Sequence, residues 1–171
     1  MTQQLSDHSV FWTDSLAREL LGFLTGRLRC PDLAAELTQD TYLGMRQIVE
    51  HNPPDNARAM AFRIAMNLAV DYQRKAMVRS RYRDNQDVDS LAESLAGNAA
   101  PPEQILIDRQ RLVALQTALS QLPEACRTVF LLHGVNGLSY AQIAQRLGIS
   151  KSQVNKLLAK AMSHCAGQLA E

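Results

Sequence analysis

The chain has 171 residues and a net charge of +1, so it is long enough for one medium domain or two small ones, and its average charge singles out no partner. Its apolar residues make up 46% of the total and are rich in Leu and Ala, whereas aromatic residues are scarce at 5%, which predicts an all-α protein. The three cysteines are widely spaced and form no CxxC pair, which argues against a disulfide framework or a zinc site. No signal peptide or membrane span is recognisable in the sequence. We therefore expect a cytoplasmic protein with reduced thiols.

The first half of the chain carries leucines and alanines at helical spacing, which predicts three helices, at residues 10–29, 32–49 and 57–80. Pro53 and Pro54 forbid helix between the second and the third, so residues 50–56 are expected to form a loop. The side chains expected to face the core from the last two helices are Leu33, Leu37, Leu43, Ile48, Phe62, Ala65, Leu68, Ala69 and Tyr72. We interpret residues 10–83 as a compact helical domain.

Residues 84–102 are acidic, rich in small side chains and end in two prolines, which predicts a flexible, largely extended linker. Beyond this segment the apolar spacing predicts four further helices, at residues 103–119, 123–132, 139–147 and 151–166. We interpret residues 103–171 as a second helical domain. The expected architecture is therefore two small helical domains joined by a flexible acidic linker.

Charge is distributed unevenly along the chain, although its sum is close to zero. Residues 58–83 hold seven basic side chains and one acidic one, residues 84–108 hold six acidic and no basic ones, and residues 125–170 hold five basic and no acidic ones. Clustered bases of this kind allow a nearly neutral chain to bind a polyanion. Each predicted domain is thus expected to offer a basic surface to nucleic acid.

The stretch LSYAQIAQRLGISKSQVNKLL near the end of the chain contains two helix starts eleven residues apart. Each start matches the capping box, because a serine, Ser139 or Ser150, stands three residues before a glutamine. Gly148 stands where the first helix needs a left-handed residue to end, and the whole pattern predicts a helix-turn-helix motif. A helical hairpin with a solvated polar face is the alternative, but the absence of acidic residues here favours DNA binding.

Motifs typical of enzymes are missing from the sequence. It has no Gly-rich phosphate loop, no nucleophile elbow and no metal-ligand cluster. The four histidines are scattered singly and are expected at surface or helix-cap positions. The residues therefore favour a binding protein that needs no metal, cofactor or small-molecule substrate.

Three motifs in a fixed order resemble the extracytoplasmic-function (ECF) sigma factors over nearly the whole chain. The segment ALSQLPEACRTVFLLHGVNGLSYAQIAQRLGISKSQVNKLLAKAM resembles their region 4, DLAAELTQDTYLGM resembles region 2.2, and FRIAMNLAVDYQRKAM resembles regions 2.3 and 2.4. The tail VNKLLAKAMSHC is most similar to the iron-starvation (FecI-like) group. The resemblance implies a factor whose first domain binds core RNA polymerase and the −10 promoter element, and whose second domain reads the −35 element.

The resemblance also implies three sets of contact residues. The −35 element is expected to be contacted by Ser139, Tyr140, Arg146, Lys151, Ser152, Gln153, Asn155, Lys156 and Lys160. The −10 element is expected to be contacted by Arg58, Arg63, Asn67, Asp71, Arg74, Lys75 and Arg79, with the loop 51–57 as the place for a flipped base. The polymerase clamp is expected to bind Glu36, Gln39 and Asp40. Asp71 could instead hold an arginine in place.

The implied partners are the clamp and flap of core RNA polymerase, promoter DNA, and a membrane-anchored anti-sigma factor that responds to a siderophore or haem receptor. Met60, Ala61, Met66 and the recognition helix depart from the family pattern, so promoter preference does not transfer. The alternative function is a stand-alone helix-turn-helix regulator that binds operators without polymerase.

The linker could be a solvated tether or could thread toward the polymerase active site. The two free domains could be loosely tethered, or packed with their DNA faces masked.

Overall fold

The computed structural model describes residues 11–83 and 101–169, which fold into helices without a strand, so the predicted all-α class is confirmed. The helices are α2 (Asp14–Leu28), α3 (Pro31–His51), α4 (Ala57–Arg83), α6 (Pro102–Ser120), α7 (Glu124–Gly134), α8 (Tyr140–Leu147) and α9 (Lys151–Leu169). None of the helices in the described ranges combines the length and the apolar character that crossing a bilayer requires. Most of the predicted linker, residues 84–100, lies outside the described residues, and its flexibility stays a prediction.

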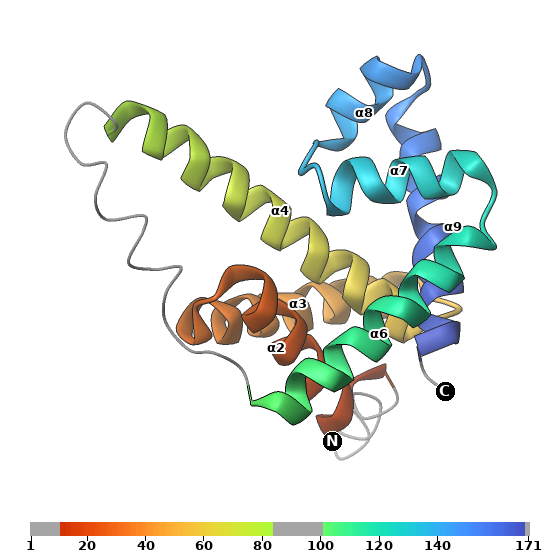
Figure 1. The fold of residues 1–171 in the computed structure, drawn as a ribbon. Helices are drawn as coiled ribbons and strands as arrows, with labels where there is room; N and C mark the ends of the chain where they lie inside the picture. Colours follow the sequence, from red (N-terminus) through yellow and green to blue (C-terminus); the bar gives the residue numbers. More distant parts are fainter. Residues whose placement is uncertain (1–10, 84–100, 170–171) are drawn as a thin grey trace, which may run out of the picture.

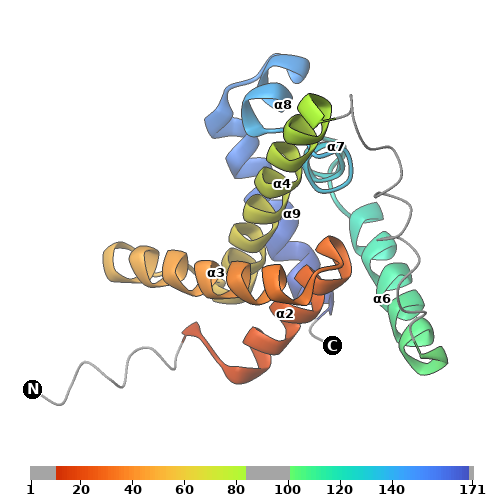
Figure 2. The same cartoon turned by 90° about the vertical axis from the view of Figure 1, so that its left-hand side faces the viewer.

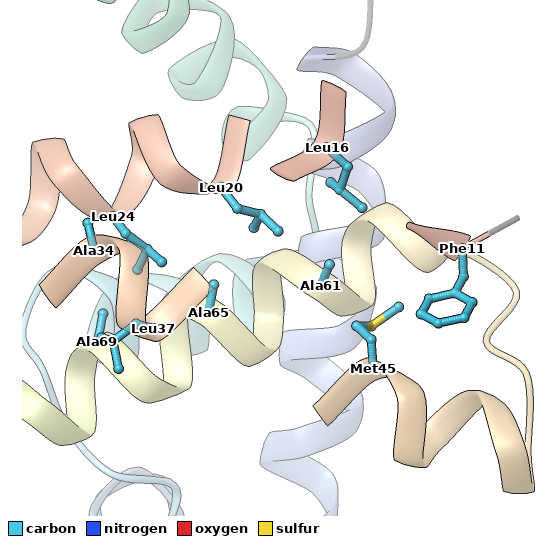
Figure 3. Close-up of a cluster of buried hydrophobic side chains, with 10 residues drawn as sticks. All are labelled: Phe11, Leu16, Leu20, Leu24, Ala34, Leu37, Met45, Ala61, Ala65 and Ala69. Atoms are coloured by element: carbon cyan, nitrogen blue, oxygen red, sulfur yellow. The ribbon is translucent and has the colours of Figure 1, made fainter. Parts of the chain in front are cut away.

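Helices α2, α3 and α4 form the N-terminal unit, which packs around one apolar core (Figure 3). Leu20 and Leu24 of α2 and Met45 of α3 are completely buried in it. The side of α4 that faces them carries alanines spaced four residues apart, namely Ala61, Ala65 and Ala69. Small side chains in one row allow α2 and α3 to approach the backbone of α4 closely.

The ends of the first two helices differ from the sequence prediction. Helix α2 begins at Asp14 and not near residue 10, because Thr13 is extended and caps it: the Leu16 N–H donates to Thr13 Oγ1 at 3.1 Å. Helix α3 runs on to His51, so the loop before α4 is shorter than predicted. Both differences concern local capping and leave the order of the helices unchanged.

Two large side chains that were predicted to be buried lie on the surface instead. Leu43 is 46% exposed, because the buried face of α3 runs through Leu37, Thr41 and Met45, and Leu43 lies between these positions on the other side of the helix. Tyr72 is 37% exposed, because it lies past the last buried residues of α4. The prediction was wrong at both positions.

Helices α6 to α9 form the C-terminal unit, in which α8 and α9 make the predicted helix-turn-helix. The capping box at α8 is complete: the Gln142 N–H donates to Ser139 Oγ at 3.2 Å, and the Ser139 N–H donates to Gln142 Oε1 at 3.0 Å. Gly148 has a φ of 68° and ends α8 in the left-handed conformation. The Gln153 N–H donates to Ser150 Oγ at 3.1 Å at the start of α9.

The C-terminal unit has apolar cores of its own. Val129, Ile143, Val154 and Leu158 are fully buried where α7, α8 and α9 meet. A second cluster, which includes Cys126, joins α6 and α7 to the far end of α9. Both clusters draw on α9, so this helix spans the unit and carries its recognition segment on a fixed support.

The two units pack against each other through α4, which lies between them (Figures 1 and 2). One side of α4 contacts α2 and α3, and another contacts α7 and α9. Ala59, Met66 and Val70 of α4 are buried in the apolar cluster of the C-terminal unit. The C-terminal end of α4 projects beyond both units, where Tyr82 is 87% exposed (Figure 1). The described residues therefore form one packed body.

Replacing Leu20 by alanine should lower the free energy of unfolding by about 3 kcal/mol, because Leu20 is completely buried and its removal leaves a cavity against α4. Leu21→Ala is the matched control, since the neighbouring leucine of the same helix is 38% exposed and should lose only about 0.5 kcal/mol. Urea unfolding followed by circular dichroism measures both. Equal losses in the two variants would contradict the position of the core.

Candidate nucleic-acid interface

The N-terminal half of α9 presents a polar face without acidic residues to solvent. The exposed side chains on it are Lys151, Ser152, Gln153, Asn155, Lys156 and Lys160. Val154 and Leu158 hold the opposite side of the helix in the core. These exposed amides, ammonium groups and hydroxyl are suited to base edges and phosphates. Arg146 of α8 is exposed as well. The structure thus brings together most of the residues predicted for the −35 element.

Two residues predicted to contact the −10 element, Arg63 and Asn67, lie on the face of α4 that packs against the C-terminal unit. They are one helical turn apart and lie in the same stripe as the buried Met66 and Val70. Both side chains are only partly accessible to solvent. This part of the predicted −10 surface is therefore covered by the C-terminal unit, whose helices were predicted to read the −35 element.

Asn67 joins α4 to α7 and α8 through a cluster of polar groups. Its Oδ1 accepts a hydrogen bond from the Tyr140 hydroxyl at 3.1 Å and lies 2.8 Å from His133 Nε2. His133 Nδ1 lies 2.8 Å from the carbonyl oxygen of Leu138, and the His133 and Tyr140 rings meet edge to face. Burial raises the pKa of Tyr140 above its ordinary value of 10.0, which keeps its hydroxyl protonated.

The prediction that His133 is a surface or cap residue was wrong, because it is buried between the two units. Burial lowers the pKa of His133 below its ordinary value of 6.5; the Leu138 carbonyl opposes this, and the charges of Arg27 and Arg74 add to it. Each ring nitrogen of His133 lies within hydrogen-bond distance of an oxygen, Nδ1 of the Leu138 carbonyl and Nε2 of Asn67 Oδ1, and the neutral ring donates to one of them. The local sequence gave no sign of this role, because Asn67 is 66 residues away.

A second polar contact joins α4 to the recognition helix. Arg63 donates from Nη1 to Asn155 Oδ1 at 3.1 Å and from Nη2 to Met60 Sδ at 3.1 Å. Arg63 was predicted to contact the −10 element, and Asn155 was predicted to contact the −35 element. In this arrangement the two side chains bind each other.

A pocket of about 340 Å³ lies where the loop before α4 faces α9. The loop lines it with residues 52–56, and Arg63 of α4 extends the same wall. Helix α9 supplies the opposite wall with Ala159, Met162 and Ser163. The pocket therefore includes most of the loop predicted to receive a flipped base, but it is closed on one side by the C-terminal unit.

Arg58 was predicted to contact −10 DNA, and the structure places it in an ion pair inside the N-terminal unit. Its Nη1 lies 2.5 Å from Glu19 Oε2 on α2, and its guanidinium lies over the Phe62 ring, 5.3 Å from the centroid. Both contacts brace the start of α4 against α2. Arg58 is thus set apart from the other predicted −10 residues.

The projecting end of α4 carries the remaining predicted −10 residues. Lys75 Nζ lies 3.0 Å from Asp71 Oδ2, so Asp71 holds a lysine one turn further on and not an arginine. Arg74 is partly accessible, and Arg79 is exposed. This helix end thus presents exposed basic side chains together with the exposed Tyr82 ring. Basic side chains suit phosphates, and an aromatic ring suits stacking on nucleobases.

The residues predicted to bind the polymerase clamp, Glu36, Gln39 and Asp40, are all exposed on α3. They lie one helical turn apart, and Leu37 and Thr41 beside them hold the helix in the core. The acidic face is therefore fixed in place and open to a partner. No three side chains of metal-binding type gather anywhere in the described parts of the chain.

Lowering the pH below about 6.5 should destabilise the protein through His133. Its folded-state pKa lies below the ordinary value, so the unfolded chain binds the proton more readily, and stability falls as the pH drops from 6.5 toward the lowered pKa. His133→Gln should weaken this pH dependence. His51→Gln, at an exposed position, should leave it as in the original chain. Thermal unfolding at pH 7.5 and 5.5 gives the comparison, and identical pH dependence in all three proteins would contradict the buried neutral ring.

Comparison with known proteins matches both units to one family. The family model for Sigma-70 region 2 matches residues 13–79, and the model for Sigma-70, region 4 matches residues 112–165. The two matches follow the order of the N-terminal and C-terminal units. They fall on the helices that carry the candidate contact residues.

Individual relatives extend this likeness over most of the chain. It is 32% identical over 146 residues to the ferric citrate uptake sigma factor FecI of Escherichia coli, which covers 85% of this chain and 82% of that protein. It is 30% identical to the ECF RNA polymerase sigma factor SigE of Mycolicibacterium smegmatis, over 81% of this chain and 52% of that protein. The RNA polymerase sigma factor CnrH of Cupriavidus metallidurans is 27% identical, over 78% of this chain and 72% of that protein. The chain therefore belongs to the ECF sigma factors of the sigma-70 family, which are DNA-binding factors for transcription initiation and not enzymes.

Proposed function

We propose that this sigma factor directs core RNA polymerase to promoters by reading the −35 element with α9 and the −10 element with α4. The exposed, acid-free face of α9 carries the first half of this proposal. Ser150 caps the helix, and its first turns offer Lys151, Gln153 and Lys156 to solvent. A capped helix with such side chains at its N-terminal end fits the major groove of duplex DNA.

The second half of the proposal assigns the −10 element to α4 and the loop before it. Asn67 supplies an amide that can pair with a base edge, and Arg63, Arg74 and Arg79 supply charges for the phosphates. The pocket beside the loop 51–57 receives an extruded base. Arg58 has a supporting role in this proposal, because its ion pair with Glu19 holds the start of α4.

The acidic face of α3 is the proposed contact with the polymerase clamp. Glu36, Gln39 and Asp40 are exposed on a helix that is anchored in the core, so a basic partner can bind without rearranging the unit. The C-terminal unit contacts the polymerase flap in this proposal. The acidic residues 84–102 connect the two sites along the sequence.

The regulon proposed for this factor is the uptake of iron, siderophores or haem. The similarity to a ferric citrate uptake sigma factor supports this assignment. In the proposal a membrane-anchored anti-sigma factor releases the protein when a siderophore or haem receptor is activated. The protein then acts in the cytoplasm, where promoter DNA and polymerase are found.

Start-site mapping tests the function directly. Core RNA polymerase is incubated with genomic fragments with and without the protein, and the 5′ ends of the transcripts are sequenced. New start sites that share −35 and −10 elements are expected. If no new start sites form and the protein binds specific duplexes alone without joining core polymerase, it is an operator-binding regulator instead.

Lys156→Glu should abolish transcription from these start sites by reversing a charge on the DNA-reading face of α9, with a loss of roughly tenfold or more in promoter binding. Binding to core polymerase should be unchanged, because α3 is untouched. Arg111→Glu makes the same charge change at an exposed position of α6, which carries no residue assigned to DNA, and should transcribe normally. Transcription and co-elution with core polymerase are measured, and normal transcripts from Lys156→Glu would refute the assignment.

Replacing Glu36, Gln39 and Asp40 together by alanine should weaken binding to core polymerase by roughly tenfold, since charged interface contacts are lost. The matched control replaces Glu103, Gln104 and Asp108 on α6, which are exposed residues of the same three types. Competition with a labelled copy of the original protein for core polymerase measures the affinity. A triple variant of α3 that competes as well as its control would rule out this clamp contact.

A further inference from the structure

The first half of α6 differs from the other helices because its side chains are solvated all the way round. Residues 102–113 are all exposed in the described structure, whereas the second half of α6 packs on α9 through Leu115, Ala118 and Leu119. Figure 2 shows the first half standing away from the other helices. A surface helix in a folded protein draws most of its stability from an apolar face that is covered, so the side chains of this segment indicate a further contact.

Four large apolar side chains gather on one side of this exposed segment. They are Ile105, Leu106, Leu112 and Val113, which are 43%, 59%, 55% and 60% exposed, respectively. Their spacing of one and seven residues places them on a single helix face, with Arg109 in its middle. Gln116 and Ser120 continue this face in the second half of α6 and are polar, so the apolar area ends at Val113. We call the four apolar residues the α6 patch.

The charges at the α6 patch are complementary to a second copy of the same segment. Asp108 lies at the edge of the patch, next to Arg109. An antiparallel copy centred between these two residues places Asp108 opposite Arg109 of its partner, and Ile105 opposite Leu112. A parallel copy would place Arg109 opposite Arg109, and like charges in such a contact are unfavourable. The sequence of charges therefore favours the antiparallel pair.

Arg109 limits which partners can cover the patch. Within the described parts of the chain, no acidic side chain lies within ion-pair distance of Arg109. A purely apolar partner would bury this guanidinium without a counter-charge, which is unfavourable. A second copy brings apolar side chains and the carboxylate of Asp108 together, and Asp108 is already held on the helix by a hydrogen bond from Gln104 Nε2 at 2.9 Å.

We propose that the α6 patch is a homodimer contact, in which two copies of the chain pair their α6 helices antiparallel around a two-fold axis. This inference goes beyond the proposed function, because no residue assigned to DNA or to the polymerase clamp lies on α6. The exposed segment is shorter than the roughly 20–30 residues that each partner gives to a standard interface, so the dimer is weak, with a dissociation constant on the order of 10 µM. At nanomolar concentrations the protein is a monomer, and the α6 variants used as controls for promoter and polymerase binding keep that role.

Sedimentation velocity of the full chain, from about 1 to about 100 µM, measures the dimer. The mean mass should rise from the 19.0 kDa of one chain toward twice that value. Val113→Gln should weaken association roughly tenfold, because it removes apolar area from the patch. Val135→Gln is the matched control, since Val135 is 74% exposed after α7, and it should associate as the original does. An original chain that keeps the monomer mass over the whole range would overturn the proposal.

An exchange of charges tests the antiparallel pairing itself. Arg109→Asp leaves two acids at the centre of the contact, and Asp108→Arg leaves two bases, so each variant alone should repel its own copy and remain a monomer. Mixed in equal amounts, the two variants should form a heterodimer, because each supplies the charge that the other lacks. Circular dichroism establishes that both are folded. A mixture that stays monomeric while the original dimerises would overturn the antiparallel contact.

Core polymerase is the other occupant that the experiment has to distinguish. Val113→Gln and Val135→Gln are compared at nanomolar concentration in competition with a labelled copy of the original protein for core polymerase. Both variants should compete as well as the original, because the patch serves the free protein. A loss confined to Val113→Gln would assign the patch to polymerase and overturn the homodimer contact. Neither assay needs a promoter, so a failure to find start sites would contradict the proposed function alone.

Discussion

Packing of α4 on two sides is the constraint on which the rest of the molecule depends. Alanines at Ala61, Ala65 and Ala69 let α2 and α3 approach closely on one side, and Met66 and Val70 fill the apolar cluster of the C-terminal unit on another. A helix buried in this way has little surface left for a third partner. Its free surface is concentrated at the projecting C-terminal end (Figure 1).

Polar groups in the contact between the units follow the rule that buried donors and acceptors need partners. Asn67, His133 and Tyr140 satisfy one another, and Arg63 is paired with Asn155. Amide and guanidinium groups are also the groups that pair with bases and phosphates. In the packed arrangement these groups are satisfied by other groups of the protein.

Elements defined by local chemistry could be predicted from the sequence. The capping box at Ser139, the left-handed Gly148 and the exposed face of α9 were predicted from spacing, and the structure has all three. The burial of a side chain that depends on which helix packs against it was predicted less well. Leu43 and Tyr72 were placed in the core from their helical spacing, but the buried face of α3 passes Leu43 by, and Tyr72 lies past the last buried residues of α4.

The sequence by itself determined the order of the helices, the caps at Ser139, Gly148 and Ser150, the helix-turn-helix and the separation of charge, because each of these depends on residues within a few turns of one another. Membership of the family could be predicted in the same way from ordered motifs. Only the tertiary structure decided that His133 is buried against Asn67 and that Arg63 meets Asn155. These contacts join residues 66 and 92 positions apart, and they depend on how two independently patterned units dock. No periodicity within either unit specifies that docking, because it depends on which faces of two separately patterned units meet.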